Sequence, residues 1–471
     1  MSGNVDDVAL FKKREKVFPK RVWGRYRKIK WLVMLFTLSV YYLTPFLRFD
    51  RGPNVPDQAI LIDMTNSRAY FFFIEIWPQE VYYLTGILIF LAVALFFVTS
   101  LFGRVWCGYM CPQTVWTDLF VWVERIVQGD RVQRMRLRSA PLSLNKVWKL
   151  LLTHSIWLVI GLFTGGAWVF YFNDAPTLLE GLLHLDVSSS VLGWMIALTL
   201  STYLFAGYAR EQVCTYVCPY SRFQSAMFDK DSLVIGYDAA RGEARGKHKK
   251  GTSFEGRGHC IDCTACVQVC PMGIDIRDGL QMECIACGLC VDACNDIMEK
   301  VDLPQGLIRY DTEAGLAGEA ATQKPRFLRP RTIWYSMILI IVGGLMLYGL
   351  LDRKSLELHV LHDRNPLYVT LSDGTLRNGY DIKILNKTHQ DVTYKLHIEG
   401  LGAYEVKVQG ANGASAEALP VYADSVGHFR LYVMSESKDQ ARTPVVFVLE
   451  ENGSNLQDSY DSVFVSKDHD H

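Results

Sequence analysis

The sequence predicts a multi-domain membrane protein with a five-span α-helical transmembrane domain, a cysteine-rich soluble domain and a C-terminal all-β sandwich. Three observations predict this fold class. Five stretches lack charged residues, eight cysteines form two regular runs, and residues 352–471 contain short alternating apolar and polar segments. A mean hydropathy of +0.10 over 471 residues fits apolar spans diluted by soluble segments.

Five uncharged stretches are long enough, or nearly long enough, to cross a bilayer: residues 31–47, 81–102, 150–172, 187–209 and 332–351. A bilayer core of about 30 Å needs about 20 apolar residues in a helix. A buried core helix is the alternative, but such a helix rarely runs this long without a charge. Some thirty polar and basic residues precede the first stretch, which distinguishes it from a cleaved signal peptide.

Lysine and arginine predict the orientation, because short loops rich in these residues stay in the cytoplasm. The tail up to residue 30 carries ten of them and the loop at 103–149 carries eight, against three at 48–80 and none at 173–186. The N-terminus is therefore expected in the cytoplasm and the C-terminus outside. The expected divisions are a basic tail (1–30), a transmembrane domain (31–228), a cytoplasmic cysteine-rich domain (229–331), a fifth span (332–351) and an external domain (352–471). Lys+Arg and Asp+Glu both total 49, so the overall charge gives no sign of a nucleic-acid partner.

Two cysteine runs predict two 4Fe-4S clusters in the cytoplasmic domain. We therefore expect this domain to be a bacterial-type ferredoxin domain. The first run has the spacing CxxCxxCxxxCP, and the second repeats it with Asn in place of Pro. In two-cluster ferredoxins the fourth cysteine of each run binds the other cluster. The expected ligand sets are therefore Cys260, Cys263, Cys266 and Cys294 for one cluster, and Cys284, Cys287, Cys290 and Cys270 for the other. A zinc site is the alternative, but zinc sites use four ligands in two pairs and do not require two such runs in succession.

Four further cysteines form a second repeated pattern, CxYxCP, at an offset of 107 residues: Cys107, Cys111, Cys214 and Cys218. Each copy follows an outside-to-inside span, so all four thiols are expected at one depth near the cytoplasmic face. Spacing of four residues puts two sulfurs on one helix face, and the proline that follows suits the first turn of a new helix. Three interpretations of these four cysteines remain open: a metal or third cluster that bridges the two copies, a dithiol redox pair, or inert buried cysteines. Four thiolates suit Cu(I), zinc or iron–sulfur, and the spacing does not choose among them.

Two other features have weaker implications. His154 lies within the third span, where it is either functional or a neutral side chain bonded to a neighbouring helix. The C-terminal domain shows strand patterns at residues 367–371, 380–385, 392–398, 404–408, 429–434 and 445–449. Several short strands in about 100 residues predict an Ig-like β-sandwich, a domain that more often binds a partner than performs chemistry.

These motifs together resemble one family. Residues 106–116 (WCGYMCPQTVW), the double run from Cys260 to Cys294, residues 306–310 (GLIRY) and residues 363–368 (DRNPLY) are similar to the CcoG/FixG/RdxA family of cytochrome c oxidase accessory proteins. The resemblance covers nearly the whole chain. It implies a bacterial inner-membrane location with a periplasmic C-terminal domain, a role in assembling cbb3-type cytochrome c oxidase, and reduction of Cu(II) to Cu(I) for the oxidase copper centre. The implied partners are oxidase subunits or copper chaperones and transporters.

The sequence therefore predicts a membrane-bound iron–sulfur electron-transfer protein. Electrons from a cytoplasmic donor would pass through the two clusters to Cys107, Cys111, Cys214 and Cys218, the expected catalytic and metal-binding thiols of a cupric reductase. One alternative is a NapH- or NosR-like relay from quinol to a partner enzyme, and another is an assembly scaffold with structural clusters. A homodimer is compatible with the sequence as well.

Overall fold

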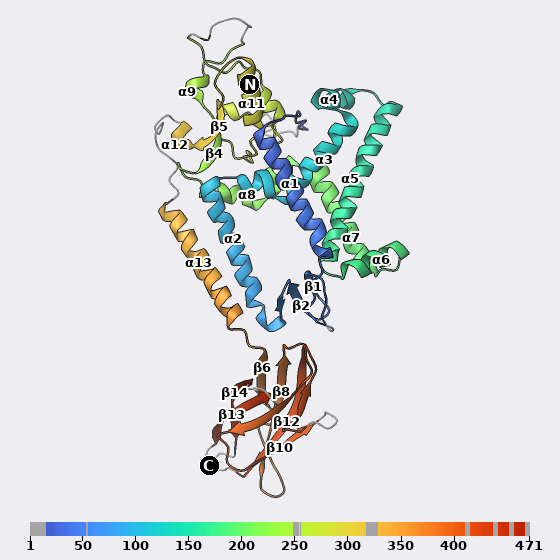
Figure 1. The fold of residues 1–471 in the computed structure, drawn as a ribbon, viewed down its shortest axis with the longest axis vertical. Helices are drawn as coiled ribbons and strands as arrows, with labels where there is room; N and C mark the ends of the chain where they lie inside the picture. The colour runs from blue at the N-terminus through green and yellow to red at the C-terminus, as the bar shows by residue number, and fades with distance from the viewer. Residues whose placement is uncertain are drawn as a thin grey trace, which may run out of the picture. The chain divides into compact units, whose positions relative to one another are not determined.

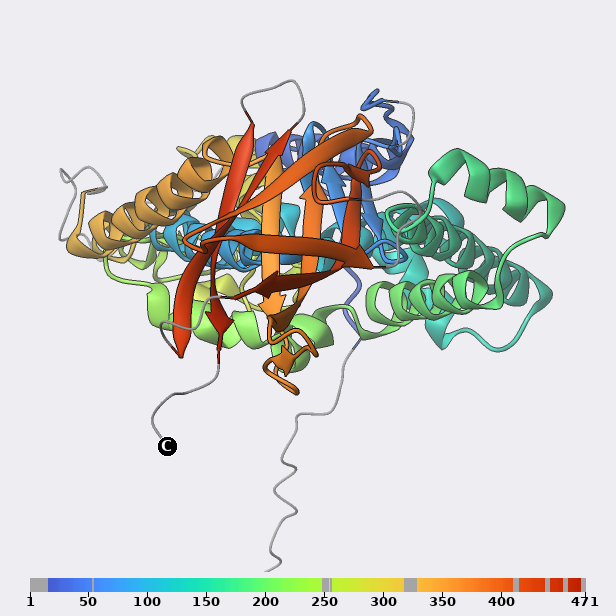
Figure 2. The same cartoon turned by 90° about the horizontal axis from the view of Figure 1, so that it is seen from below.

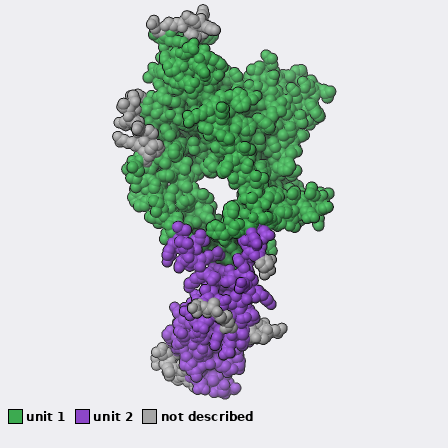
Figure 3. Space-filling view, in the orientation of Figure 1, with its two compact units in different colours: residues 1–49, 58–346 green, residues 50–57, 347–471 purple. Residues whose placement is uncertain are grey.

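The structure, a computed structural model, describes residues 16–52, 55–247, 254, 256–316, 328–409, 415–436, 441–451 and 456–466. The chain forms two compact units, shown in two colours in Figure 3. The first contains residues 1–49 and 58–346, and the second contains residues 50–57 and 347–471. The first four spans, most of the fifth and the cysteine-rich domain thus belong to one unit, and the β-domain belongs to the other.

Among the described residues, five helices are long and apolar enough to cross a membrane, which confirms the five expected spans. These helices are α1 (Arg25–Leu43), α2 (Tyr82–Phe102), α5 (Leu144–Phe170), α7 (Ser189–Thr202) and α13 (Pro330–Leu351) (Figure 1). A π-helical segment, η4 (Tyr203–Ala209), continues α7. Helices α1 and α5 begin before the uncharged stretches do, because lysine and arginine are good helix formers whose long side chains reach toward polar surroundings.

Shorter elements connect the spans of the first unit. Helices α3 (Pro112–Gln128) and α4 (Arg131–Ser139) lie between α2 and α5, α6 (Ala175–His184) precedes α7, and α8 (Pro219–Phe223) follows it. A small antiparallel sheet, which the sequence did not suggest, joins α1 to α2. Its strands are β1 (Ile60–Asp63), β2 (Arg68–Phe71) and β3 (Ile74–Ile76).

The cysteine-rich domain is small and has few regular elements. Strands β4 (Leu233–Tyr237) and β5 (Ile308–Thr312) pair antiparallel, and the helices α10 (Ala265–Val269) and α11 (Leu289–Lys300) pack on each other. Buried Ile235, Ile308 and Met298 form its apolar core together with several of the cysteines. The cysteine loops therefore depend on a small core for support.

The first turn of α1 joins the cysteine-rich domain to the helices of the same unit. The Asp292 carboxylate of α11 accepts hydrogen bonds from the backbone N–H groups of Tyr26, at 3.2 Å, and Arg27, at 2.7 Å. Two of the donors that every helix leaves free at its start are thereby satisfied. Gly24 permits this approach, since a Cβ there would lie 2.3 Å from the Asp292 carboxyl carbon.

Two buried carboxylates of α3 are held by cations from other elements. Asp118 accepts from the Arg27 guanidinium at 2.8 and 2.9 Å, and Glu124 accepts from Arg134 at 2.6 Å and from Arg210 at 2.7 Å. Burial alone would raise the pKa of Asp118 and Glu124, but the neighbouring cations hold both pKa values below their usual range. Removing one partner of such a buried pair typically costs about 3–5 kcal/mol, because the other charge stays buried without compensation.

The second unit contains a β-sandwich (Figures 1 and 2). One sheet has the order β10-β12-β8-β6 with β7 beside β8, and the other has the order β11-β9-β13-β14. The strands are β6 (Leu356–His362), β7 (Val369–Thr370), β8 (Leu376–Asn386), β9 (Val392–Glu399), β10 (Tyr404–Gln409), β11 (Leu419–Val421), β12 (Ser425–Ser435), β13 (Arg442–Glu451) and β14 (Gln457–Val465). Tyr380, Tyr394, Phe447 and Phe464 are fully buried between the sheets. The expected sandwich is confirmed, and β6, β11 and β14 are strands that the sequence analysis missed.

Substitution of Asp292 by Ala should loosen the start of α1. It removes the acceptor of one buried and one partly buried N–H group, and losing such a cap costs about 1–2 kcal/mol. We expect hydrogen–deuterium exchange of the Tyr26 and Arg27 amides in the full-length protein to accelerate on the order of tenfold. The control is Asp296→Ala, which removes a carboxylate from the same helix that pairs with exposed Lys300 instead. Equal acceleration in both variants would contradict the assigned role of Asp292.

Candidate metal centres

The first expected ligand set surrounds one small cavity. Cys260, Cys263, Cys266 and Cys294 all line it, together with apolar side chains of β5 and α11. Cys294 comes from the second cysteine run, on α11, and the other three come from the first run. Cys260 and Cys266 are buried, whereas Cys263 is exposed. We call these four residues the outer ring, because one of its members reaches the surface.

The second expected set surrounds a neighbouring cavity. Cys284, Cys287, Cys290 and Cys270 line it with Ile274, Ile276 and Ile285, and Cys266 of the outer ring also borders it. Here Cys270 is the residue that comes from the other run. We call Cys284, Cys287, Cys290 and Cys270 the inner ring. Both rings thus bring together the cysteines that the crossed pattern anticipated.

The loops around the inner ring bend sharply where the cysteines approach one another. Ala286 and Gly288 both have positive φ, 49° and 74°. This conformation turns the Ala286 N–H toward the Cys284 sulfur, at 3.4 Å. Backbone donors aimed at sulfur stabilise a thiolate, so the loop is built for negatively charged cysteines.

Burial keeps these thiols protonated until a metal replaces the protons. It raises the pKa of Cys266 and Cys284 to about 11 and the pKa of Cys270 and Cys294 to about 12. Neighbouring sulfurs of the same ring add to the effect. Metal binding at such a site releases protons, because cysteine binds metals as the thiolate. Two neighbouring cavities, each lined by the four cysteines of one ring and mostly by apolar side chains otherwise, fit 4Fe-4S clusters.

The CxYxCP cysteines occupy matching places in the two copies of the repeat. Cys107 lies in a π-helical segment, η3 (Trp106–Met110), and Cys214 lies in another, η5 (Val213–Val217). Cys111 and Cys218 follow as the N-caps of α3 and α8, and Pro112 and Pro219 occupy the first turns of those helices. The expected role of the prolines is therefore confirmed. Both segments lie just beyond the ends of membrane helices.

These four cysteines, which we call the membrane thiols, are near enough to influence one another. Burial first, and then Cys111, Cys214 and Cys218, raise the pKa of Cys107 to about 12. The pKa of Cys214 rises to about 12 for the same reasons. Within the described part of the chain, no three Cys, His, Asp or Glu side chains converge closely enough to enclose a single metal ion. The same holds for the cysteines of the outer and inner rings.

The segment that carries Cys107 packs directly on the inner-ring loop. The Tyr109 hydroxyl donates to the Cys287 carbonyl at 3.1 Å, and the Arg104 guanidinium donates to the carbonyls of Cys284, at 3.0 Å, and Met282. A Cβ on Gly108 would lie 2.7 Å from the Ile285 carbonyl oxygen. The backbone of η3 is therefore in contact with the backbone of the inner-ring loop, between the membrane thiols and the inner ring. The sequence analysis included Tyr109 in the CxYxCP pattern but gave no role to it, nor to Arg104 or Gly108. The one signal was that the first copy has Gly108 where the second has Thr215.

His154 has a hydrogen-bond partner on the neighbouring span. Its Nδ1 lies 3.0 Å from the hydroxyl of Tyr203 in η4. Its ring also packs edge-on against Trp157. These contacts agree with the reading of a histidine satisfied by an adjacent helix.

Three family models match the chain. The model described as "4Fe-4S binding domain" matches residues 84–128, and the model described as "4Fe-4S dicluster domain" matches residues 209–313. A third, described as "IG-like fold at C-terminal of FixG", matches residues 346–467. The matches cover both sets of membrane thiols, both rings and the β-sandwich.

Curated relatives match along nearly the whole chain. The nitrogen fixation protein FixG of Rhizobium meliloti is 47% identical, with 97% of this chain and 93% of the relative covered. Protein RdxA of Cereibacter sphaeroides is 47% identical, with 90% of each chain covered, and protein RdxB of the same organism is 45% identical, with 98% of each covered. The chain is a membrane iron–sulfur protein with a C-terminal Ig-like domain, and it belongs to the FixG/RdxA family.

Proposed function

We propose that this protein delivers single electrons to copper at the membrane thiols, reducing Cu(II) to Cu(I) for assembly of a cbb3-type cytochrome c oxidase. The observation that carries the proposal is the packing of η3 on the inner-ring loop. It joins a candidate cluster site to a candidate copper site through one hydrogen bond, from Tyr109 to Cys287, and through backbone contact at Gly108.

The proposed cluster ligands are the four cysteines of each ring. Clusters bound there supply one-electron carriers. The exposed Cys263 makes the outer ring the side at which a soluble electron donor of the cytoplasm would approach. The inner ring has no exposed cysteine among its four members, and it contacts η3. In this proposal electrons pass from the surface to the outer ring, then to the inner ring and then to the membrane thiols.

Copper is the substrate in this proposal. Each Cu(II) ion takes up one electron and becomes Cu(I), and the thiols that bind it release their protons. Thiolate sulfur prefers Cu(I), so reduction and binding favour each other. A third 4Fe-4S cluster at the membrane thiols is the second candidate, because the "4Fe-4S binding domain" model covers Cys107 and Cys111.

We also propose that the rings face the cytoplasm and that the β-sandwich lies in the periplasm of a bacterial inner membrane. The support is the alternation of Lys and Arg between the loops, ten and eight on one side against three and none on the other. In this arrangement the sandwich is the part that meets oxidase subunits or copper carriers outside the cytoplasm.

Substitution of Cys270 by Ala should damage the centre of the inner ring, although Cys270 belongs to the first run. The intact protein should contain about eight iron and eight acid-labile sulfide per chain, or about twelve of each if the membrane thiols hold a third cluster. The variant should lose about four of each, with electron paramagnetic resonance showing the outer-ring signal preserved. Selective loss of the outer-ring signal would contradict the crossed ligation.

Removal of either thiol pair should abolish copper binding and copper reduction as fully as removal of both pairs. The double variants are Cys107→Ala/Cys111→Ala and Cys214→Ala/Cys218→Ala. Two sulfurs cannot complete a site that four are needed to form, so the effects should be strongly non-additive. Copper is measured by elemental analysis after anaerobic loading, with ring iron as the control. Retention of half the copper in each double variant would indicate two independent sites.

Substitution of Gly108 by Ala should slow electron delivery while sparing both centres. The new methyl group meets the Ile285 carbonyl oxygen at 2.7 Å, so η3 and the inner-ring loop must separate. Displacements of this kind cost on the order of tenfold to hundredfold in rate. The measurement is the rate of Cu(I) formation after anaerobic reduction of the protein. Gly193→Ala, where a Cβ has open space, is the matched control, and unchanged kinetics in Gly108→Ala would rule out this contact as the route.

A further inference from the structure

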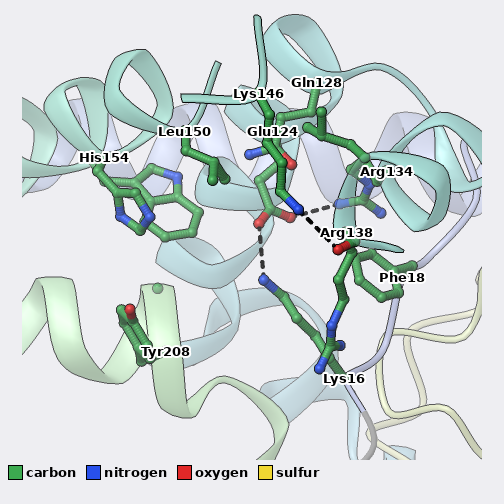
Figure 4. A pocket seen from close by; sticks show the side chains of 13 residues that line it. Lys16, Phe18, Glu124, Gln128, Arg134, Arg138, Lys146, Leu150, His154 and Tyr208 are labelled. Atoms are coloured by element: carbon green, nitrogen blue, oxygen red, sulfur yellow. Dashed lines mark hydrogen bonds and ion pairs between the residues drawn. The ribbon is translucent and has the colours of Figure 1, made fainter. Parts of the chain in front are cut away.

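A cavity of about 380 Å³ lies in the first unit, away from the three cysteine sites. The N-terminal segment before α1, the helices α3, α4 and α5, and η4 all contribute to its walls. Figure 4 shows cationic side chains on one side of the cavity and His154 and Tyr208 on the other. The proposed electron-transfer function uses none of these residues.

The lining carries a clear excess of positive charge. Lys16, Arg134, Arg138 and Lys146 face a single lining carboxylate, that of Glu124. Glu124 is already neutralised by its short ion pairs with Arg134 and with Arg210. Burial lowers the pKa of Lys16; Glu124 opposes this effect, while Arg210, Arg138 and Arg134 add to it.

Lys146 is held in place by uncharged groups, and Lys16 shares a carboxylate that two arginines already pair with. The Lys146 ammonium donates to the carbonyl oxygens of Arg138, at 3.1 Å, and Ala140, at 2.5 Å. Lys16 lies 3.8 Å from Glu124. Carbonyl groups carry no net charge, so Lys16, Arg138 and Lys146 together form an anion-binding wall.

The opposite wall follows the membrane helix α5, where apolar Leu150 and Trp157 lie beside the polar His154. Lys146, Leu150 and His154 are spaced four residues apart on α5, so they share one face of that helix. Lys146 lies in its first turn, and His154 lies about 12 Å further along the axis. The side chains of Leu150 and Trp157 line this deeper part. The cavity therefore changes from strongly cationic to largely uncharged along α5, in the direction in which a lipid changes from head group to acyl chain.

Exposed apolar residues around the start of α5 place this region at a membrane surface. Leu142, Leu144 and Trp148 are 84%, 88% and 63% exposed, and the membrane-spanning stretch begins at Leu144. On α4, Val132 and Met135 are exposed between arginines. Such a mixture of cationic and apolar side chains is typical of helices lying at the bilayer interface.

We propose that this cavity binds the head group of an anionic phospholipid. The phosphate lies between Lys16, Arg138 and Lys146, and the first part of an acyl chain follows Leu150 and Trp157. The bound lipid holds the N-terminal segment in place. That segment contacts the cysteine-rich domain, where the Lys20 N–H donates to the Gln268 carbonyl at 2.8 Å. The lipid thus strengthens the attachment of that domain to the membrane helices.

The test uses the full-length protein with its clusters, delipidated and placed in nanodiscs of phosphatidylcholine with a varied fraction of phosphatidylglycerol. Native mass spectrometry counts the phosphatidylglycerol that stays bound after release from the nanodisc. The triple variant Lys16→Gln/Arg138→Gln/Lys146→Gln is compared with Lys20→Gln/Arg136→Gln/Lys149→Gln. The second triple removes three charges from the same two regions of the chain, but none of its residues lines the cavity.

We expect one retained phosphatidylglycerol in the unchanged protein and in the control triple. In the cavity triple, the apparent affinity should fall about 100-fold, since each basic residue near an anionic lipid contributes about fivefold. In the single variant Arg138→Gln, at an exposed position, the apparent affinity for phosphatidylglycerol should fall about fivefold. This variant covers the case in which the triple variant fails to fold. Iron content of each variant, equal to that of the unchanged protein, confirms folding.

Three results would overturn the proposal. In the first, the cavity triple variant retains the lipid as the unchanged protein does. In the second, both triple variants lose the lipid equally, which would indicate general attraction to an anionic surface. In the third, inorganic phosphate or a neutral quinone displaces the lipid at the same concentration as phosphatidylglycerol does, which would assign the cavity to a different ligand.

Discussion

The first turn of α1 is the point on which the first unit depends. Asp292 of the cysteine-rich domain accepts its backbone donors, and the Arg27 side chain reaches from the same turn to the buried Asp118 of α3. One residue, Arg27, therefore bonds to two elements that lie far apart in the sequence. Because both carboxylates are largely buried, each would lose more by separation than an exposed pair would. This constraint fixes the position of the cysteine loops relative to α3. Because Cys111 is the N-cap of α3, it also fixes their position relative to that thiol.

The two copies of the CxYxCP repeat have different structural tasks. In the first, Gly108 and Tyr109 contact the inner-ring loop, and α3 then continues for 17 residues and carries Asp118 and Glu124. In the second, Thr215 replaces the glycine, and α8 has 5 residues. The first copy therefore supplies the attachment to the cysteine-rich domain, while the second supplies the other two thiols and Arg210.

Much of this architecture could be predicted from the sequence, because the signals are local. Span length, cysteine spacing and the proline after each CxYxC pattern each depend on a few neighbouring residues. The contacts of Arg104, Gly108 and Tyr109 could not be predicted, since their partners lie about 180 residues away and are backbone carbonyls without a side-chain signature. Strand β14 was missed because its sequence, QDSYDSVFV, is polar along most of its length and has only Phe464 fully buried. It is recognised as a strand by its pairing with β13.

The exposure of Cys263 has a consequence for handling the protein in air. The exposed side of the outer ring, at which we propose that an electron donor approaches, also admits dioxygen and small chelators, whereas isoleucines and η3 enclose the inner ring. Oxidative decay should therefore proceed in one direction, from the outer ring inward. Under the proposed electron path, partly degraded preparations would keep the inner-ring centre and lose the centre that accepts electrons from the donor. They would then contain iron but transfer no electrons to copper.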